Sequence, residues 1–190
     1  MKQNTVIFDI DEVIAMTWTE FSRVFERLSG KVVPYEDFHT IYFYDIYGIH
    51  FCNQTMMDEK VLENCLPVEG AVECFNEIRK AGNRIVLVTA RGWHNDAMRV
   101  TEQWFNHFGL KYDELHVVPG HEGKTLAFDR VAKDSRIIAF VDDQPRYIEQ
   151  GVTHNDVENV FIFDRPWNRQ VEGNRIFSLK EFSEAVKKIV

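Results

Sequence analysis

The sequence predicts one α/β domain built on a parallel, doubly wound, five-stranded sheet. Short runs of β-branched and aromatic residues alternate along the chain with segments of helical periodicity, which is the pattern of helices covering both faces of a parallel sheet. Two of these runs, at residues 6–8 and 136–141, lead directly into pairs of aspartates. With 190 residues and 45% apolar content, the chain is long enough to bury a sizeable core.

Composition excludes several classes of protein. A formal charge of −8 argues against tight binding to long nucleic acid, which depends on clustered Lys and Arg, but it permits a small phosphorylated substrate. No apolar run approaches the roughly 20 residues that cross a bilayer, so we expect no membrane contact. The three cysteines lack metal-type spacing and no signal peptide is recognisable, so we expect a cytoplasmic protein with reduced thiols.

The first expected strand is the apolar run Val6–Phe8, which ends at Asp9 and Asp11. In an extended chain, residues i and i+2 point to the same side about 6 to 7 Å apart, so the two carboxylates converge. Like charges held that close need a cation or a proton, and Mg²⁺ is a fitting partner because it takes one or two carboxylates plus water and phosphate oxygens. On this segment alone, two surface aspartates in a turn explain the pattern equally well.

Residues 16–66 form an expected small helical insertion over the mouth of the sheet, and residues 1–15 and 67–190 form the α/β core. A capping-box pattern at 17–20 predicts a helix that stops at Gly30, and a second short helix is expected from about 54 to 65. The intervening stretch is rich in Tyr and Phe. These aromatics form either a miniature core or a pocket for a flat group such as a nucleobase, with Tyr42 and Tyr44 as candidate substrate contacts.

From residue 67 onward, helices and strands alternate regularly. Helices are expected at 70–81, 95–108, 124–133, from Pro145, and at 179–189, and strands at 84–88, 114–118, 136–141 and 159–163. Trp104 and Phe105 fall on the inward face of their helix and are expected in the core.

Polar residues gather at one predicted edge of this sheet. Ligands of open α/β sheets bind beyond the carboxyl ends of the strands, where the strand order reverses. If the first strand is central, with the second and third on one side and the fourth and fifth on the other, this edge holds Asp9, Asp11, Thr89, Asp142 and Asp143. Four carboxylates in one crevice repel unless a divalent cation lies among them.

These residues resemble the four ordered motifs of the haloacid dehalogenase superfamily of phosphotransferases. The motifs are Asp9-Ile10-Asp11, the hydroxyl residue Thr89, a lysine, and the pair Asp142-Asp143, and the resemblance covers residues 5 to about 168. Within the superfamily, the segments 67–71, 89–91, 101–104 and 163–168 look similar to the 5'(3')-deoxyribonucleotidase family and its bacterial and phage relatives. The resemblance implies a Rossmann-like core and a small helical cap after the first strand.

The resemblance also implies roles for individual residues. Asp9 would be the nucleophile that forms an aspartyl-phosphate, and Asp11 the acid and base. Mg²⁺ would be held by Asp9, the Asp11 backbone carbonyl and Asp142, with Asp143 orienting a metal-bound water. Phosphoryl oxygens would be bound by the Thr89 hydroxyl, the Ala90 backbone N–H and a lysine.

Two lysines compete for this last role. Lys124 starts the crossover helix at the catalytic edge, whereas Lys133 ends it about 13 Å away at 1.5 Å per residue, so Lys124 is favoured and Lys133 is the alternative. Arg91 either touches substrate or pairs with a neighbouring acid. Glu12 stands where the family usually has glycine, which predicts ordinary backbone angles or strain there and adds a fifth carboxylate near the site.

The leading functional hypothesis is therefore a Mg²⁺-dependent phosphomonoesterase, a 5'-nucleotidase acting on (deoxy)nucleoside monophosphates. One alternative is a polynucleotide 3'-end phosphatase, against which the acidic charge and the lack of a basic stripe weigh. The other is a phosphate- or nucleotide-binding protein without turnover, motivated by Glu12. Base, sugar and ester-position preference and oligomeric state do not follow from the sequence.

Overall fold

The fold is a six-stranded parallel sheet in the order β3-β2-β1-β4-β5-β6, in a computed structural model that describes residues 2–37 and 40–189, without the side chains of residues 40–42. This confirms the doubly wound α/β class and the central position of β1, Gln3–Phe8. The predicted number of five strands is wrong by one. The sixth, β6 (Asn174–Ile176), is a three-residue edge strand with a single buried side chain, so it lacks the apolar run that marks the others.

The remaining elements follow the alternation predicted from residue 67 onward. They are β2 Arg84–Thr89, β3 Glu114–Val117, β4 Ser135–Asp142, β5 Val160–Phe163, α5 Ala71–Lys80, α6 Ala97–His107, α7 Thr125–Ala132, α8 Pro145–Thr153 and α9 Leu179–Ile189. The 3₁₀ turn η2 spans Pro166–Asn168.

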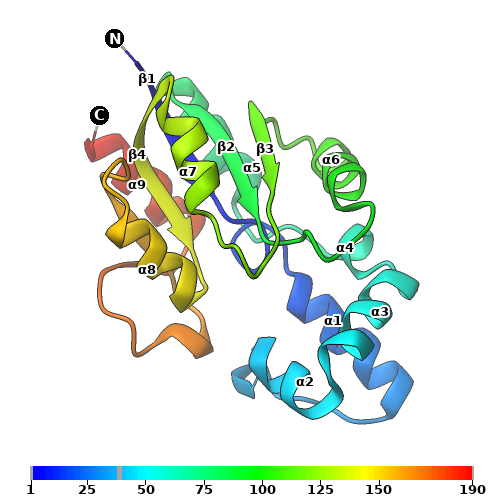
Figure 1. Ribbon diagram of the computed structural model, residues 1–190. Helices are drawn as coiled ribbons and strands as arrows, with labels where there is room; N and C mark the ends of the chain where they lie inside the picture. Colours follow the sequence, from blue (N-terminus) through cyan, green and yellow to red (C-terminus); the bar gives the residue numbers. More distant parts are fainter. Residues whose placement is uncertain (1, 38–39, 190) are drawn as a thin grey trace.

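Helices cover both faces of the sheet (Figure 1). On one face, α5, α6 and α9 pack on the sheet through a core that includes Phe75, Phe105 and Phe182. On the other, α7 packs through Phe128 and Val131. Trp104 and Phe105 of α6 are 3% and 0% exposed, which confirms their expected place in the core.

Between β1 and α5 the chain forms α1 Thr17–Ser29, η1 Tyr35–Asp37, α2 Thr40–Tyr47, α3 Ile49–Asp58 and α4 Val61–Asn64. The helices lie beyond the carboxyl ends of the strands (Figure 1). The helix predicted at 54–65 is divided into α3 and α4 at Lys60, whose φ of 54° is left-handed. Trp18, Phe21, Phe25 and Phe43 pack together in a hydrophobic cluster of their own.

The two ends of this segment are joined by backbone hydrogen bonds. The Met16 N–H donates to the Leu66 carbonyl and the Val68 N–H donates to the Ile14 carbonyl, both at 2.8 Å. The chain therefore leaves and re-enters the sheet layer at one point.

Among the residues described, none of the helices combines the length and apolar character required to cross a membrane.

Candidate active site at the carboxyl edge of the sheet

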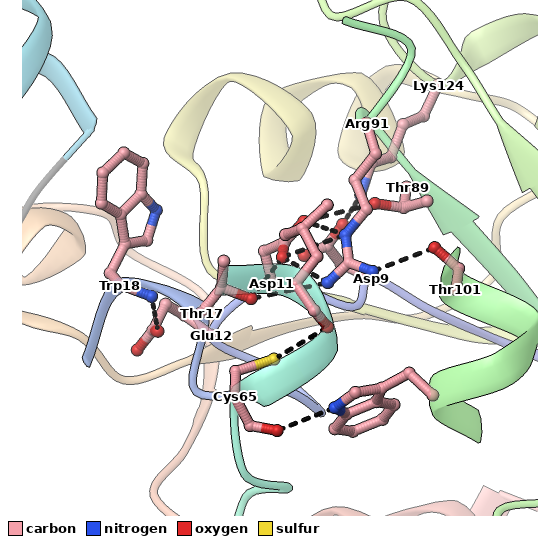
Figure 2. A network of polar contacts seen from close by, with 12 residues as sticks. Asp9, Asp11, Glu12, Thr17, Trp18, Cys65, Thr89, Arg91, Thr101 and Lys124 are labelled. Atoms are coloured by element: carbon pink, nitrogen blue, oxygen red, sulfur yellow. Dashed lines mark hydrogen bonds and ion pairs between the residues drawn. The ribbon is translucent and has the colours of Figure 1, made fainter. Parts of the chain in front are cut away.

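Three buried carboxylates and one buried ammonium meet at the ends of β1 and β4. Asp9 follows β1, Asp142 ends β4, and Asp143 comes next; they are 5%, 0% and 2% exposed. Lys124 Nζ donates to Asp142 Oδ2 at 2.6 Å and also to Asp9 Oδ1. Lys124 stands at the N-terminus of α7, which begins at this edge, and its side chain reaches Asp9 across the site (Figure 2).

This cluster could hold a divalent cation. One carboxylate oxygen from each of Asp9, Asp142 and Asp143 lies within 4.8 Å of the others. Asp143 Oδ1 is buried and has no hydrogen-bond partner among the residues that the structure describes, although a buried carboxylate oxygen is normally satisfied. A single ammonium does not balance three carboxylates, and hard oxygen donors suit Mg²⁺.

Burial raises the pKa values of the three carboxylates in the cluster. Without a metal ion, burial and the nearby Asp142 raise the pKa of Asp9 to about 8, although the Lys124 ammonium opposes the shift. Burial and the neighbouring carboxylates likewise hold the pKa of Asp143 well above its usual range. Burial disfavours the Lys124 ammonium, but Asp142 and Asp9 outweigh it and raise the pKa of Lys124. A bound cation would favour the ionised carboxylates.

Asp11 is held apart from this cluster by an arginine. Arg91 Nε donates to Asp11 Oδ2 at 3.0 Å and Nη2 donates to Oδ1 at 2.7 Å. Burial raises the pKa of Asp11, but the Arg91 guanidinium outweighs it and the pKa is lowered. Of the two expectations for Arg91, the structure shows the ion pair.

Thr17 also contacts Asp11 instead of capping its own helix. Its hydroxyl donates to Asp11 Oδ1 at 2.5 Å, and α1 has no capping bond from the side chain of its N-cap residue Met16. The predicted capping box at 17–20 is therefore wrong. The residue that caps α1 is Glu12, whose Oε1 accepts the Trp18 N–H at 2.8 Å.

Glu12 departs from expectation in its direction as well. Its side chain points to the N-terminus of α1 and lies 3.7 Å from the guanidinium of Arg165, so it does not join the three-aspartate cluster (Figure 2). Its φ of 59° is left-handed, which shows that position 12 is strained for a residue with a Cβ. Burial raises the pKa of Glu12 to about 7 against the pull of Arg165.

The other predicted site residues are divided by the structure. Thr89 ends β2 fully buried, with Oγ1 3.4 Å from Asp11 Oδ2, and Ala90 follows it beside the cavity. Lys133 is exposed at the far end of α7, so Lys124 is the lysine that meets the acids. The side chain of Tyr42 lies outside the described residues. All assigned roles in phosphate binding stay predictions.

A cavity of about 670 Å³ opens above these groups. Asp9, Asp11 and Asp143 line it together with the aromatic side chains Trp18, Tyr44 and Trp93. The two expectations for the aromatics of the helical segment are not exclusive, because Trp18 both packs in the cluster around Phe43 and lines the cavity. A second cavity of about 790 Å³ lies at the opposite edge of the sheet, around Lys2 and Arg136, and contains none of the predicted site residues.

The loop after β5 also reaches the site. Trp167 Nε1 donates to Asp143 Oδ2 at 2.8 Å, and Asn168 Nδ2 donates to the Asp143 carbonyl at 2.7 Å. Arg165 Nη2 donates to the Glu12 carbonyl at 2.6 Å. These three side chains therefore contact residues of the site, whereas Arg169 pairs at the surface with Glu36.

Several cavity residues were not predicted from the sequence. They are Thr17, Trp18, Asn53, Trp93, His121, Gln144, Arg146 and Tyr147. Gln144, Arg146 and Tyr147 directly follow the acidic pair, so their closeness in sequence to Asp143 was a usable signal. Trp93 follows Thr89 closely and carried the same signal, whereas Asn53 had none, because its position depends on how α3 packs.

Comparisons with known proteins agree with this geometry, although no family model matches the chain. A Bacillus cereus protein described as a putative nucleotidase is 24% identical over 190 residues, covering 95% of this chain and 97% of that protein. A haloacid dehalogenase superfamily hydrolase from Ehrlichia chaffeensis aligns over 100% of this chain and 98% of its own, with a TM-score of 0.59 and 14% identity.

Two further solved structures have similar values. A subfamily IA hydrolase of the same superfamily from Geobacter sulfurreducens covers 97% of this chain and 96% of its own, with a TM-score of 0.64 and 12% identity. A phosphoserine phosphatase, solved as an analogue of its phospho-aspartyl intermediate, covers 97% and 99%, with a TM-score of 0.62 and 16% identity. The chain has the fold of the haloacid dehalogenase superfamily hydrolases.

Proposed function

We propose that the protein is a Mg²⁺-dependent phosphomonoesterase that acts on nucleoside monophosphates through an aspartyl-phosphate at Asp9. The observation that carries this proposal is the cavity itself, which is lined both by Asp9 and Asp11 and by Trp18, Tyr44 and Trp93. A phosphoryl group at the acids would leave a flat base within reach of the aromatic wall, where stacking is favourable.

The chain's own residues supply the chemistry. The negative charge of the bound phosphate beside Asp11 would favour its protonated form against the pull of Arg91, so that Asp11 begins the cycle with a proton. Asp9 attacks phosphorus, the bond to the leaving oxygen breaks, and Asp11 gives that oxygen its proton; a water then attacks phosphorus, Asp11 takes its proton, and inorganic phosphate leaves Asp9. The Thr89 hydroxyl, the Ala90 N–H and the Lys124 ammonium bind phosphoryl oxygens. Mg²⁺, held by Asp9, Asp142 and the Asp11 carbonyl with Asp143 behind them, would offset the negative charge of phosphate and acids.

Two of the comparisons support the proposal. The phosphoserine phosphatase shares the fold and is described with a phospho-aspartyl intermediate, and the Bacillus cereus protein is described as a nucleotidase. The position of Glu12 supports turnover as well. Because its carboxylate caps α1, the crowding of acids that motivated a protein without turnover is smaller than the sequence implies.

The test is phosphate release from deoxyribo- and ribonucleoside monophosphates with and without Mg²⁺. We expect release that EDTA abolishes and that Asp9→Asn reduces at least 1,000-fold, with Asp45→Asn on the exposed surface of α2 as the matched control. Activity that survives Asp9→Asn would refute the mechanism. A preference for 3'-phosphorylated oligonucleotides would favour the end phosphatase, and ligand-induced stabilisation without release would favour a binding protein.

A further inference from the structure

Arg91 is a buried charged group beside the site that the proposed chemistry does not use. It is 1% exposed and every one of its three guanidinium nitrogens has a partner. Nε and Nη2 donate to Asp11, and Nη1 donates to Thr101 Oγ1 on α6 at 3.0 Å (Figure 2). Thr101 is itself fully buried, so the guanidinium is fixed from behind while it grips the carboxylate.

The two oxygens of Asp11 have different surroundings. Oδ1 accepts the stronger contacts, from Arg91 Nη2 at 2.7 Å and from Thr17 Oγ1 at 2.5 Å. Oδ2 accepts Arg91 Nε at 3.0 Å and lies 3.4 Å from Thr89 Oγ1, the hydroxyl expected to hold the phosphoryl group. Oδ1 is therefore the anchored oxygen, and Oδ2 is the one turned toward the place where chemistry would occur.

We propose that Arg91 is a positioning residue, held by Thr101, that fixes the Asp11 carboxylate by Oδ1 so that Oδ2 faces the leaving oxygen. This inference rests on the proposed function, because it assigns the orientation of that reaction's acid and base. Geometry within about 1 Å governs proton transfer between heavy atoms, so a small rotation of Asp11 would reduce the rate strongly.

A direct contact between Arg91 and substrate fits the structure less well. All three guanidinium nitrogens of Arg91 are already engaged by Asp11 and Thr101, and the side chain is buried. The guanidinium fork also explains why arginine stands here, since it holds a carboxylate and a third group in one plane and the ammonium of a lysine does not.

The experiment compares Arg91→Lys and Thr101→Val with wild type, on two substrates in Mg²⁺. One is a nucleoside 5'-monophosphate, whose alkoxide leaving group needs a proton. The other is 4-nitrophenyl phosphate, whose phenolate leaves without one, followed by its burst of 4-nitrophenol, which reports the first step alone. Thr101→Ser restores the hydroxyl, and Arg99→Lys, an exposed arginine of the same helix, is the matched control.

We expect Arg91→Lys to lower kcat on the nucleotide at least tenfold, with KM changed less than threefold and the 4-nitrophenol burst rate changed less than threefold. Thr101→Val should reproduce the pattern at smaller amplitude, and Thr101→Ser and Arg99→Lys should behave as wild type. In an Asp11→Asn background, Arg91→Lys should not lower the residual kcat on the nucleotide further, because Arg91 acts through Asp11.

Three results would overturn the inference. A fall in the 4-nitrophenol burst rate as large as the fall in kcat on the nucleotide would show a general structural role. A large rise in KM with unchanged kcat would show that Arg91 binds substrate. Additive effects of Asp11→Asn and Arg91→Lys would show that Arg91 acts independently of Asp11. Wild-type protein that releases phosphate from neither substrate would overturn the proposed function as well, whereas an active wild type with any of the three patterns overturns only the role of Arg91.

Discussion

In the metal-free protein, the stability of the Glu12→Gln variant relative to wild type should be higher at neutral pH than at acidic pH. Glu12 is 1% exposed, and burial raises its pKa from 4.5 to about 7. The unfolded chain therefore loses this proton at lower pH than the folded chain does. The stability that Glu12 contributes is present below pH 4.5 and is lost as the pH rises through 7. Glutamine keeps an oxygen that accepts the Trp18 N–H and removes the titration.

The expected size follows from the shift. One pKa unit corresponds to about 1.4 kcal/mol, and integration between pH 5 and 7.5 gives about 2 kcal/mol of stability lost by wild type but not by Glu12→Gln. For a chain of this length, 1 kcal/mol moves Tm by about 2–4 °C. The Tm difference between variant and wild type should therefore grow by about 4–8 °C over this range.

The measurement is thermal unfolding in EDTA at half-unit steps from pH 5 to 7.5. Burial also raises the pKa values of Asp9 and Asp143 in both proteins, so only the difference between the two proteins is interpreted. The Glu12 carboxylate adds to the rise at Asp143, so its removal lowers that pKa and acts in the same direction as the predicted difference. Glu172→Gln, which changes an exposed carboxylate in the loop before β6, should show a difference that does not vary with pH. If the Tm difference between Glu12→Gln and wild type does not vary with pH, or if it shifts in favour of wild type as the pH rises, the reasoning is wrong.

Three other predictions concern the acidic cluster. Lys124→Met leaves Asp9 and Asp142 without their cation, so urea unfolding in EDTA should show a loss of about 3–5 kcal/mol, against none for the exposed Lys133→Met; equal effects would contradict the ion pairing. Mg²⁺ at 100 times its Kd should stabilise wild type by about 2.7 kcal/mol and Asp142→Asn far less, as measured by thermal shift; equal stabilisation of both would place the ion elsewhere. Trp167→Phe removes the N–H that Asp143 Oδ2 accepts, so calorimetry should show Mg²⁺ affinity reduced about 10-fold, and unchanged affinity would mean that this bond does not orient Asp143.

The sequence was informative wherever one chain segment determined the outcome. Buried strands could be predicted from their runs of apolar residues. Because parallel strands share one carboxyl edge, the end of β1 also predicted where Asp9 and Asp11 lie. The start of a crossover helix likewise brought Lys124 to the acids. β6 escaped notice because an edge strand of three residues buries one side chain and needs no apolar pattern.

Side-chain partners were predicted less well, because they depend on which segments meet. Thr17 has the sequence context of a helix cap, yet its hydroxyl donates to Asp11 instead. From the sequence, Glu12 is expected to be a fifth acid in the crevice. In the structure its carboxylate instead accepts the Trp18 N–H at the N-terminus of α1 and lies near the guanidinium of Arg165, 153 residues away in sequence. Four converging carboxylates suggested one metal cluster, and the structure keeps Asp9, Asp142 and Asp143 together while Arg91 pairs with Asp11.

The paired hydrogen bonds between residues 14–16 and 66–68 have a consequence for how this protein can change. Because these hydrogen bonds bring the two ends of the intervening segment together, the geometry of the sheet does not depend on the number of residues in that segment. For a flexible segment, each doubling of length adds only about 0.6 kcal/mol of closure entropy. Insertions and deletions in residues 30–60 can therefore reshape the cavity, which residues of α2 and α3 help to line, while Asp9 and Asp142 keep their places, so the cavity wall and the acidic cluster can change independently in evolution.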